Sequence, residues 1–406
     1  MLRCILLKNR FVFNKILDDL YLIRQIDLDT KYFESIWEIP EGVVYNSYVL
    51  NTSNGSIVFD TVKKNYCSEY IEFLDKNINL KNVKYIVSHH GEPDHSGCVK
   101  ELSDETNAVV IGHPILGREL SSFYNLTRFK PVNDGESLKI GEYTLVFHYL
   151  PWLHWPETIV SHIVEKNVLL TCDIFGSYGV YFNEIYFDEL SVEKQREYLI
   201  RARKYFANII GYYREWVLKN IEKTSSIGLK PEIALPAHGL AYRGDSIDLI
   251  KEYYLKWSRG EVIDKKIVIV YTSMYRFVEE TVNDLASILG ENGFKPIVFG
   301  FNDTYRSSIS DIIGELIDCE TIVLATSSYD SSVFPIAKLV AELIVKKIPR
   351  NKNIVVLGAY GWGYRVSREL SDIFVKNGFN VKTFDYQAGQ HKSIIREIFD
   401  KITGSS

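Results

Sequence analysis

The chain has 406 residues, of which 46% are hydrophobic and 24% charged, as in a globular protein large enough for two or three domains. A formal net charge of −5 and a pI near 6.0 argue against partners such as nucleic acid or an anionic membrane surface. No apolar run approaches the roughly 18 residues that a membrane-spanning helix needs, so no membrane partner is expected either.

The start of the chain and its cysteines indicate a cytoplasmic protein. The opening "MLRCILLKNR" contains an apolar patch too short for the core of a signal peptide. The five cysteines are odd in number, scattered, and without CxxC spacing, which favours reduced thiols over a disulfide framework. They are Cys4, Cys67, Cys98, Cys172 and Cys319.

Residues 1–260 are expected to form one domain of mixed α/β character. Short strand-like runs separated by polar turns alternate with helical stretches, including one over 67–77 and a longer one over about 192–223, where apolar residues recur every three or four positions. The polar, glycine-containing segment "LKWSRGEVIDKK" then has the composition of a linker. The strand-like runs are Val43–Leu50, Ser56–Val62, Val83–Val87, Ala108–Ile111, Tyr143–Leu150 and Val168–Thr171.

Residues 261–406 show a different rhythm. Each of the five apolar runs "KIVIVYTS", "KPIVFGF", "TIVLATSS", "NIVVLGAYG" and "NVKTFDY" precedes a segment with helical periodicity. Strands that alternate with helices in this way predict a five-stranded parallel sheet covered on both faces. The second domain is therefore expected to be a doubly wound α/β domain.

The segment "SHHGEPDHSG" concentrates metal-binding side chains directly after an apolar strand. His90, Glu92, Asp94 and His95 lie at intervals of two, two and one. Alternate side chains of an extended segment share a face, and a bend after Asp94 turns the next residue the other way. Two pairs of ligands for two metals are thus available. Further candidate ligands stand at strand ends downstream, namely His154, Asp173 and His238.

The other histidines have a simpler interpretation. A lone histidine is most often a surface residue or a hydrogen-bonded structural one, and we place His113, His148, His162 and His391 in that class. His89 precedes the motif and points away from its neighbour if the segment is extended. An aspartate after a strand is as often a helix cap as a ligand. Asp173 is therefore a candidate ligand only because the other candidates accompany it.

The motif resembles HxHxDH of the metallo-β-lactamase superfamily, with Glu92 in place of the second histidine. A harder oxygen ligand shifts preference from zinc towards iron or manganese. This HxExDH variant resembles that of the flavodiiron proteins (A-type flavoproteins). The resemblance continues through "EGVVYNSYVL", "LHWPET", "TCDIFGSYG" and "PAHG" into the second half. It implies an N-terminal metallo-β-lactamase-like αββα sandwich joined to a C-terminal flavodoxin-like domain with a doubly wound five-stranded parallel sheet.

The resemblance also implies a ligand set for two non-haem irons. His90, Glu92 and His154 would hold one iron, Asp94, His95 and His238 would hold the other, and Asp173 would bridge them. Flavodiiron proteins often carry a histidine before the "YNSY" element, whereas the comparable "KYFESIWEIPEG" has none. A proton donor would then be another group, such as Glu34 or a tyrosine, and oxygen and nitric oxide both stay open as substrates.

Three loops of the second half resemble the FMN-binding loops of flavodoxins, which leave the carboxyl ends of the parallel strands. Two depart from the pattern: Arg276, Phe277 and Val278 replace glycine and hydroxyl residues, and Ser327 and Asp330 replace proline and asparagine. The residues expected at the flavin are Thr272, Ser273, Met274, Tyr275, Arg276, Phe277 and Val278 in the first loop, Thr326, Ser327, Ser328, Tyr329 and Asp330 in the second, and Ala359, Tyr360, Gly361, Trp362 and Gly363 in the third.

By this resemblance the chain is expected to be an oxidoreductase that reduces oxygen to water or nitric oxide to nitrous oxide. A head-to-tail homodimer, or a dimer of dimers, would bring the FMN of one subunit beside the irons of the other. The chain has no fused CxxC pair, so the electron donor would be external: rubredoxin, a reduced deazaflavin or a flavin reductase. The alternative is a metallo-hydrolase whose second half is a binding or dimerisation module, against which Glu92 argues.

Overall fold

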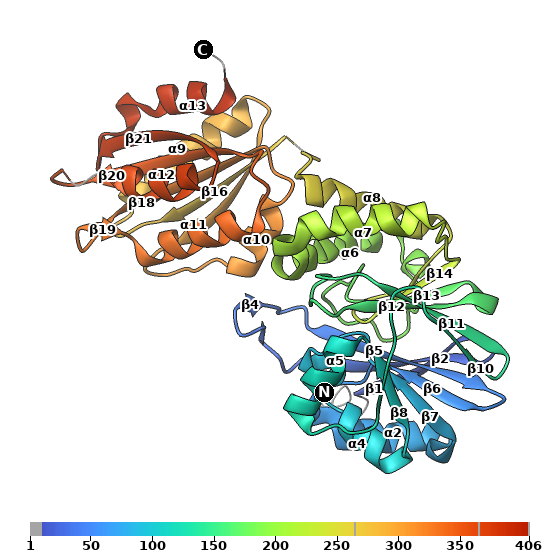
Figure 1. Ribbon diagram of the computed structural model, residues 1–406. Helices are drawn as coiled ribbons and strands as arrows, with labels where there is room; N and C mark the ends of the chain where they lie inside the picture. The colour runs from blue at the N-terminus through green and yellow to red at the C-terminus, as the bar shows by residue number, and fades with distance from the viewer. Residues whose placement is uncertain (1–9, 264, 364–365, 405–406) are drawn as a thin grey trace. The chain divides into compact units, whose positions relative to one another are not determined.

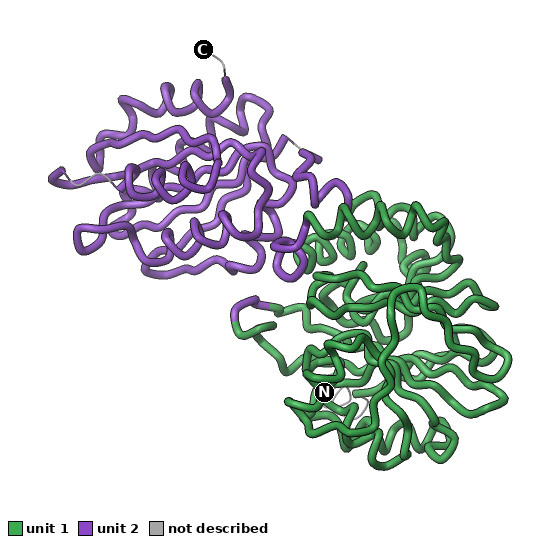
Figure 2. The backbone as a smooth tube through the Cα atoms, viewed as in Figure 1, with its two compact units in different colours: residues 1–35, 39–206, 215–254 green, residues 36–38, 207–214, 255–406 purple. Residues whose placement is uncertain are grey.

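The computed structural model describes residues 10–263, 265–363 and 366–404 (Figure 1). The chain divides into two compact units (Figure 2). The first comprises residues 1–35, 39–206 and 215–254, and the second comprises residues 36–38, 207–214 and 255–406. Across the described ranges, every helix is too short or too polar to cross a membrane.

The first unit contains two large β-sheets. The seven-stranded sheet has the order β1-β2-β5-β6-β7-β8-β9 and the six-stranded sheet the order β10-β11-β12-β13-β14-β15. The bounds of the first are Phe11–Leu17, Leu20–Asp27, Val43–Thr52, Gly55–Phe59, Val83–Val87, Val109–Gly112 and Phe129–Pro131. Those of the second are Ser137–Ile140, Tyr143–Tyr149, Ile159–Ile163, Val168–Cys172, Ile233–Pro236 and Tyr242–Arg243, and the short strands β3 and β4 are Tyr32–Phe33 and Trp37–Glu38.

The two sheets stack face to face because each presents an apolar face. Leu22 and Tyr48 lie opposite each other on β2 and β5. They belong to one buried cluster with Phe147, Leu170 and Leu235 of the second sheet. Removing these side chains from water is the main force that holds the sheets together. The carboxyl ends of β7, β11, β13 and β14 are thereby held at fixed positions.

Helices cover the outer faces of both sheets (Figure 1), which gives the expected αββα sandwich. On the first sheet these are α2 (Cys67–Asn77), α4 (Val99–Thr106) and α5 (Pro114–Tyr124), and on the second α6 (Val192–Tyr205), α7 (Arg214–Ser226) and α8 (Asp245–Arg259). The single helix expected over 192–223 is interrupted. A π-helical turn over 206–210 and a 3₁₀ turn beginning at Gly211 separate α6 from α7.

The second unit has a parallel sheet in the order β17-β16-β18-β20-β21, which confirms the five strands expected from the sequence. Burial of Ile269, Val323 and Val355 packs this sheet against its helices. The strands β16, β17, β18, β20 and β21 are Lys266–Thr272, Lys295–Phe301, Thr321–Tyr329, Asn353–Tyr360 and Asn380–Gln387, and β19 (Ser332–Val333) pairs antiparallel with β18. The helices are α9 (Phe277–Glu291), α10 (Ile309–Leu316), α11 (Pro335–Lys347), α12 (Val366–Lys376) and α13 (Ile395–Thr403).

The expectation that all cysteines are reduced thiols is wrong for one pair. Cys67 and Cys98 form a disulfide, with Cα atoms 5.1 Å apart, within the usual range for such a bond. The fold brings the start of α2 beside the residue that precedes α4, a proximity that a separation of 31 residues does not reveal. Cys172 and Cys319 are free and buried, and Cys4 lies outside the described residues.

Arg24 on β2 ties several loops of the first unit together from a fully buried position. Its guanidinium donates to the Asn46 side chain at 3.1 Å and to the backbone carbonyls of Tyr181, Glu184 and Gly239 at 3.0, 2.7 and 3.3 Å. A planar group with five N–H donors is suited to satisfy several carbonyls at once. Arg24 therefore anchors the segment that follows β14.

The substitution Arg24→Met is expected to lower the free energy of unfolding by about 3 kcal/mol, because it leaves several buried acceptors without a donor. Urea denaturation followed by circular dichroism measures the change. Arg259→Met is the matched control, since this side chain is 55% exposed. Equal stability losses in the two variants would contradict the anchoring role of Arg24.

Candidate metal centre

The seven candidate ligands gather at one end of the stacked sheets, although they come from four segments of the chain. Four belong to the segment after β7, where the bend comes earlier than expected, because the short helix α3 (Pro93–Ser96) begins before Asp94 and not after it. The fifth lies between β11 and β12, the sixth directly follows β13, and the seventh follows β14. In this order they are His90, Glu92, Asp94, His95, His154, Asp173 and His238.

Asp173 stands at the centre of the cluster, and its two oxygens face different histidines. Oδ1 lies 3.1 Å from His95 Nε2 and 3.2 Å from His238 Nε2. Oδ2 lies 3.2 Å from His154 Nε2 and 3.4 Å from His90 Nδ1. The carboxylate therefore divides the four imidazoles into two pairs.

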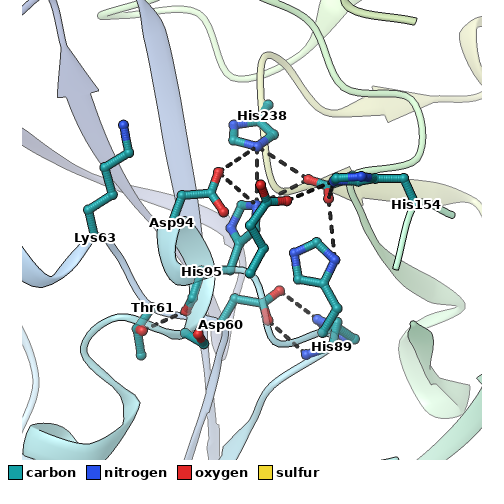
Figure 3. A network of polar contacts seen from close by, with 12 residues as sticks. Asp60, Thr61, Lys63, His89, Asp94, His95, His154 and His238 are labelled. Carbon is teal, nitrogen blue, oxygen red and sulfur yellow. Dashed lines mark hydrogen bonds and ion pairs between the residues drawn. The ribbon is translucent and has the colours of Figure 1, made fainter. Parts of the chain in front are cut away.

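The other two carboxylates each accompany one of these pairs. Glu92 Oε2 lies 2.7 Å from His154 Nε2. Asp94 Oδ2 lies 3.5 Å from His238 Nε2 and 3.6 Å from His95 Nε2 (Figure 3). Each half of the cluster thus has two imidazoles, one carboxylate of its own and one oxygen of Asp173.

The cluster is buried and leaves several polar atoms without hydrogen-bond partners. Both ring nitrogens of His90, both oxygens of Asp94 and Oδ2 of Asp173 are in this state. A buried polar atom without a partner is costly, and buried carboxylates need a compensating cation. The donor atoms of His90, His154 and Asp173 lie within 4.8 Å of one another, as do those of His95, Asp173 and His238. The arrangement fits metal ions, one in each half.

The electrostatics of the cluster are those of an anionic pocket. Burial disfavours the charged form of His95, but Asp94 and Asp173 outweigh it and raise the pKa of His95 to about 10. Burial lowers the pKa of His90 to about 4. Burial also opposes ionisation of Asp173, yet the neighbouring imidazoles, first His90, hold its pKa well below the usual range. A cation placed here meets ionised carboxylates and replaces the protons on the imidazoles.

Backbone and side-chain contacts fix the orientation of the ligating groups. The Nδ1 atom of His238 lies 2.8 Å from the carbonyl oxygen of Val44, so its Nε2 atom faces the cluster. Thr61 bonds the carbonyl oxygen of His95 through its backbone N–H at 2.7 Å and its hydroxyl at 2.6 Å. These contacts hold two ligands in place before any metal binds.

His89 lies outside the cluster, as expected from its place in the motif. Its ring Nδ1 lies 2.6 Å from Asp60 Oδ2, and its backbone N–H donates to Asp60 Oδ1 (Figure 3). Its ring Nε2 lies 2.9 Å from Ser161 Oγ. Asp60 was not singled out from the sequence. The signal available was its position directly after the buried run "SIVF", as Asp173 directly follows β13.

Glu157 is a second residue that the sequence analysis did not single out. Its Oε1 accepts the backbone N–H of Gly91 at 2.7 Å, which holds the link between His90 and Glu92. Glu119 lies beside it; burial, then the charge of Glu157, raises the pKa of Glu119 to about 7. The quoted motif "LHWPET" contains Glu157, but only the fold shows that it reaches the metal-binding loop.

The remaining histidines are placed away from the cluster. His113 stacks on Tyr149, His162 lies 3.1 Å from the Asn167 side chain, and His391 pairs with Asp284. Glu34, suggested above as a proton donor, has a carboxylate oxygen within 4.8 Å of donor atoms of Glu92 and His154. It is exposed, at the edge of the cluster.

The three loops expected at a flavin all leave the carboxyl ends of parallel strands, β16, β18 and β20. Trp362 in the third loop is 97% exposed, so an aromatic face is available for a flavin ring. The first loop fits the phosphate of FMN less well, because Val278 is buried in the core of the unit. Tyr364 and Arg365, which directly follow the residues expected in the third loop, lie outside the described residues.

Comparisons with known proteins agree with this architecture. Residues 43–239 match the family described as "ODP family beta lactamase". The rubredoxin-oxygen oxidoreductase of Megalodesulfovibrio gigas is 28% identical over 90% of this chain and 90% of its own length. The nitric oxide reductase of Moorella thermoacetica is 26% identical over 86% of each chain.

Solved structures extend the similarity to both units. A flavo di-iron protein from Thermotoga maritima, a histidine-to-aspartate mutant, superposes with a TM-score of 0.89 and 30% sequence identity. The superposition covers 97% of this chain and 97% of that one. Both the αββα sandwich and the doubly wound sheet are therefore shared, and the chain belongs to the flavodiiron protein family.

Proposed function

We propose that this protein reduces oxygen to water, nitric oxide to nitrous oxide, or both, at two non-haem irons in the first unit, with electrons supplied through FMN in the second. The observation that carries the proposal is the position of Asp173, whose two oxygens each face one pair of histidines. His90, Glu92 and His154 would hold one iron, and Asp94, His95 and His238 the other, with Asp173 shared.

The chemistry of the donor set favours iron. Four imidazoles and three carboxylates, with no thiolate among them, suit a metal harder than the zinc of thiolate sites. Three carboxylates also offset most of the charge of two ferrous ions. Two irons bound here would supply two electrons together to a small ligand. Hydrolysis would instead need a metal-activated water, and Glu92 in place of a histidine disfavours the zinc that hydrolases of this fold use.

The chain's own residues provide access to the cluster. Phe33, Glu34, Lys63, Glu92 and Asp94 line an open depression beside it. Glu92 and Asp94 belong to opposite halves of the cluster, so a small substrate that enters by this depression reaches both halves. The depression suits a diatomic gas, which needs no shaped pocket for recognition.

Protons must reach the same place, because reduction of one oxygen molecule to two waters takes four protons and four electrons. Two nitric oxides take two of each to give nitrous oxide and water. Tyr45 is buried beside the second half of the cluster, with its ring centroid 5.3 Å from that of His238. Burial and the charge of Asp94 raise the pKa of Tyr45, so its hydroxyl keeps a proton beside the cluster.

An external reductant completes the proposal. The names of two relatives, a rubredoxin-oxygen oxidoreductase and a nitric oxide reductase, support a rubredoxin-type donor and a gaseous substrate for this chain. A reduced deazaflavin or a flavin reductase would serve the same role. A head-to-tail homodimer, or a dimer of dimers, would bring the flavin of one subunit to the irons of its partner. The protein is proposed to act in the cytoplasm.

Asp173→Asn is expected to reduce the iron content from two per chain to less than one. The substitution keeps the size of the side chain but removes the charge that both halves of the cluster share. Elemental analysis of anaerobically reconstituted protein measures the content. Asp188→Asn, at a 44% exposed side chain, is the control. Retention of two irons by Asp173→Asn would rule out the shared role.

Tyr45→Phe is expected to lower the rate of gas reduction by about tenfold or more, in the range for loss of a general acid, while the iron content stays unchanged. Tyr70→Phe is the matched control, since its buried hydroxyl lies 2.6 Å from Ser47 Oγ instead. Rates for reduced enzyme are followed with oxygen and nitric oxide electrodes. An unchanged rate in Tyr45→Phe would exclude this hydroxyl as the donor.

Parallel assays of oxygen and nitric oxide consumption by the chemically reduced, iron-loaded protein test the function itself. The wild type is expected to consume at least one of the two gases. The His95→Ala variant is expected to lose this consumption and to retain the absorbance of the flavin. Zinc as the bound metal, together with no gas consumption, would reject the proposal in favour of the hydrolase. Comparison of the two rates also ranks the substrates.

A further inference from the structure

The first loop of the second unit runs from β16 to α9, where a flavin phosphate would lie, but its hydroxyl groups are already engaged. Thr272 Oγ1 lies 2.6 Å from Thr326 Oγ1, and Thr326 Oγ1 donates to the carbonyl oxygen of Ser327 at 3.3 Å. The proton of Thr272 is therefore directed at Thr326. Both hydroxyl protons are used within the domain, and both threonines are fully buried.

The next positions of the loop add little that would bind a phosphate. Ser273 Oγ accepts the backbone N–H of Glu279 at 3.2 Å, so one amide at the start of α9 is already occupied. Val278 is directed into the hydrophobic core. Arg276 adopts a left-handed backbone conformation, with φ of 69°, and its side chain is 74% exposed. No hydroxyl side chain stands at 276–278.

The charge of the loop also disfavours a phosphate. Glu279 and Glu280 both lie in the first turn of α9. Glu279 is only 21% exposed and is held in the loop, with Oε1 accepting from Asn302 Nδ2 at 3.3 Å and Oε2 3.8 Å from Arg276 Nε. The one arginine is thus paired with a carboxylate. A phosphate carries nearly two negative charges, and the carboxylates already complement the helix dipole there.

Aromatic side chains are exposed at the same edge of the sheet. Tyr275 follows β16, Tyr305 follows β17, Tyr329 ends β18 and Trp362 follows β20; their exposed fractions are 81%, 58%, 41% and 97%. The carboxyl ends of parallel strands meet at one edge, where doubly wound domains bind their ligands. Aromatic side chains exposed together indicate a binding surface, and flat rings stack on them.

We propose that this edge binds a flavin through its isoalloxazine ring alone, so that the phosphate of FMN adds no affinity and riboflavin binds as tightly as FMN. The inference rests on the proposed function only in taking a flavin as the ligand of the second unit. It assigns the recognition to the aromatic side chains, Trp362 above all, and none to the hydroxyl groups, the backbone amides or Arg276 of the loop between β16 and α9.

Titration of the full-length, flavin-free protein with riboflavin and with FMN, followed by flavin fluorescence, tests the proposal. The two dissociation constants are expected to agree within about threefold, and the FMN constant to be insensitive to salt, since no charge-assisted bond to phosphate forms. FMN binding more than about 30-fold tighter than riboflavin would overturn the inference while leaving the proposed function intact. Absence of binding by either flavin would overturn both the inference and the flavin route of the proposed function.

Two variants sharpen the test. Trp362→Ala is expected to weaken the binding of riboflavin and of FMN by the same factor, about tenfold or more, because the flavin ring loses a stacking partner. Glu279→Gln removes a negative charge from the loop and is expected to leave riboflavin binding unchanged. Circular dichroism confirms folding of each variant. If Trp362→Ala weakened FMN alone, or left both constants unchanged, the assignment to the ring would be wrong.

Discussion

The contact between the Asp173 carboxylate and two separate pairs of imidazoles is the interaction on which the site depends. It requires both sheets of the first unit. His90 and His95 leave the first sheet after β7, whereas His154, Asp173 and His238 leave the second. Each half of the cluster contains ligands from both sheets, so the apolar core between the sheets sets the distance between the ligands. The geometry of the centre therefore depends on the same core packing that stabilises the sandwich.

This dependence explains which residues surround the cluster. Arg24 anchors the segment around Gly239, next to His238, and Glu157 holds the amide of Gly91, next to His90. Neither touches a metal position, but each restrains the backbone beside a ligand. Such restraint matters because a buried cluster of charges is tolerated only in a well-defined geometry.

Much of this arrangement could be predicted from the sequence, for physical reasons. The spacing of His90, Glu92, Asp94 and His95 is local information, and the five strands of the second unit follow from continuous apolar runs. Contacts between distant segments could not be predicted. Asp60 and Glu157 act through hydrogen bonds to distant parts of the chain, and the Cys67–Cys98 disulfide depends on the packing of α2 against the metal-binding segment. The break before α7 was also missed, because helical periodicity continues through it.

The second unit combines family architecture with its own chemistry. The sheet order and the loop positions are those of a domain that binds a planar cofactor at its carboxyl edge, and Trp362 presents a ring there. Glu279 occupies the loop where a phosphate would be held. A flavin held by its ring alone would bind more weakly but could still carry electrons. The fraction of the protein that contains flavin would then depend on the flavin concentration around it.

We propose that Asp173 joins two irons into one redox centre. The Mössbauer spectrum of the anaerobically iron-loaded protein, recorded after oxidation, tests it most directly. A diamagnetic ground state from two magnetically coupled ferric ions is expected in the wild type, with loss of that coupling in Asp173→Asn. Uncoupled, mononuclear ferric signals in the fully loaded wild type would contradict it.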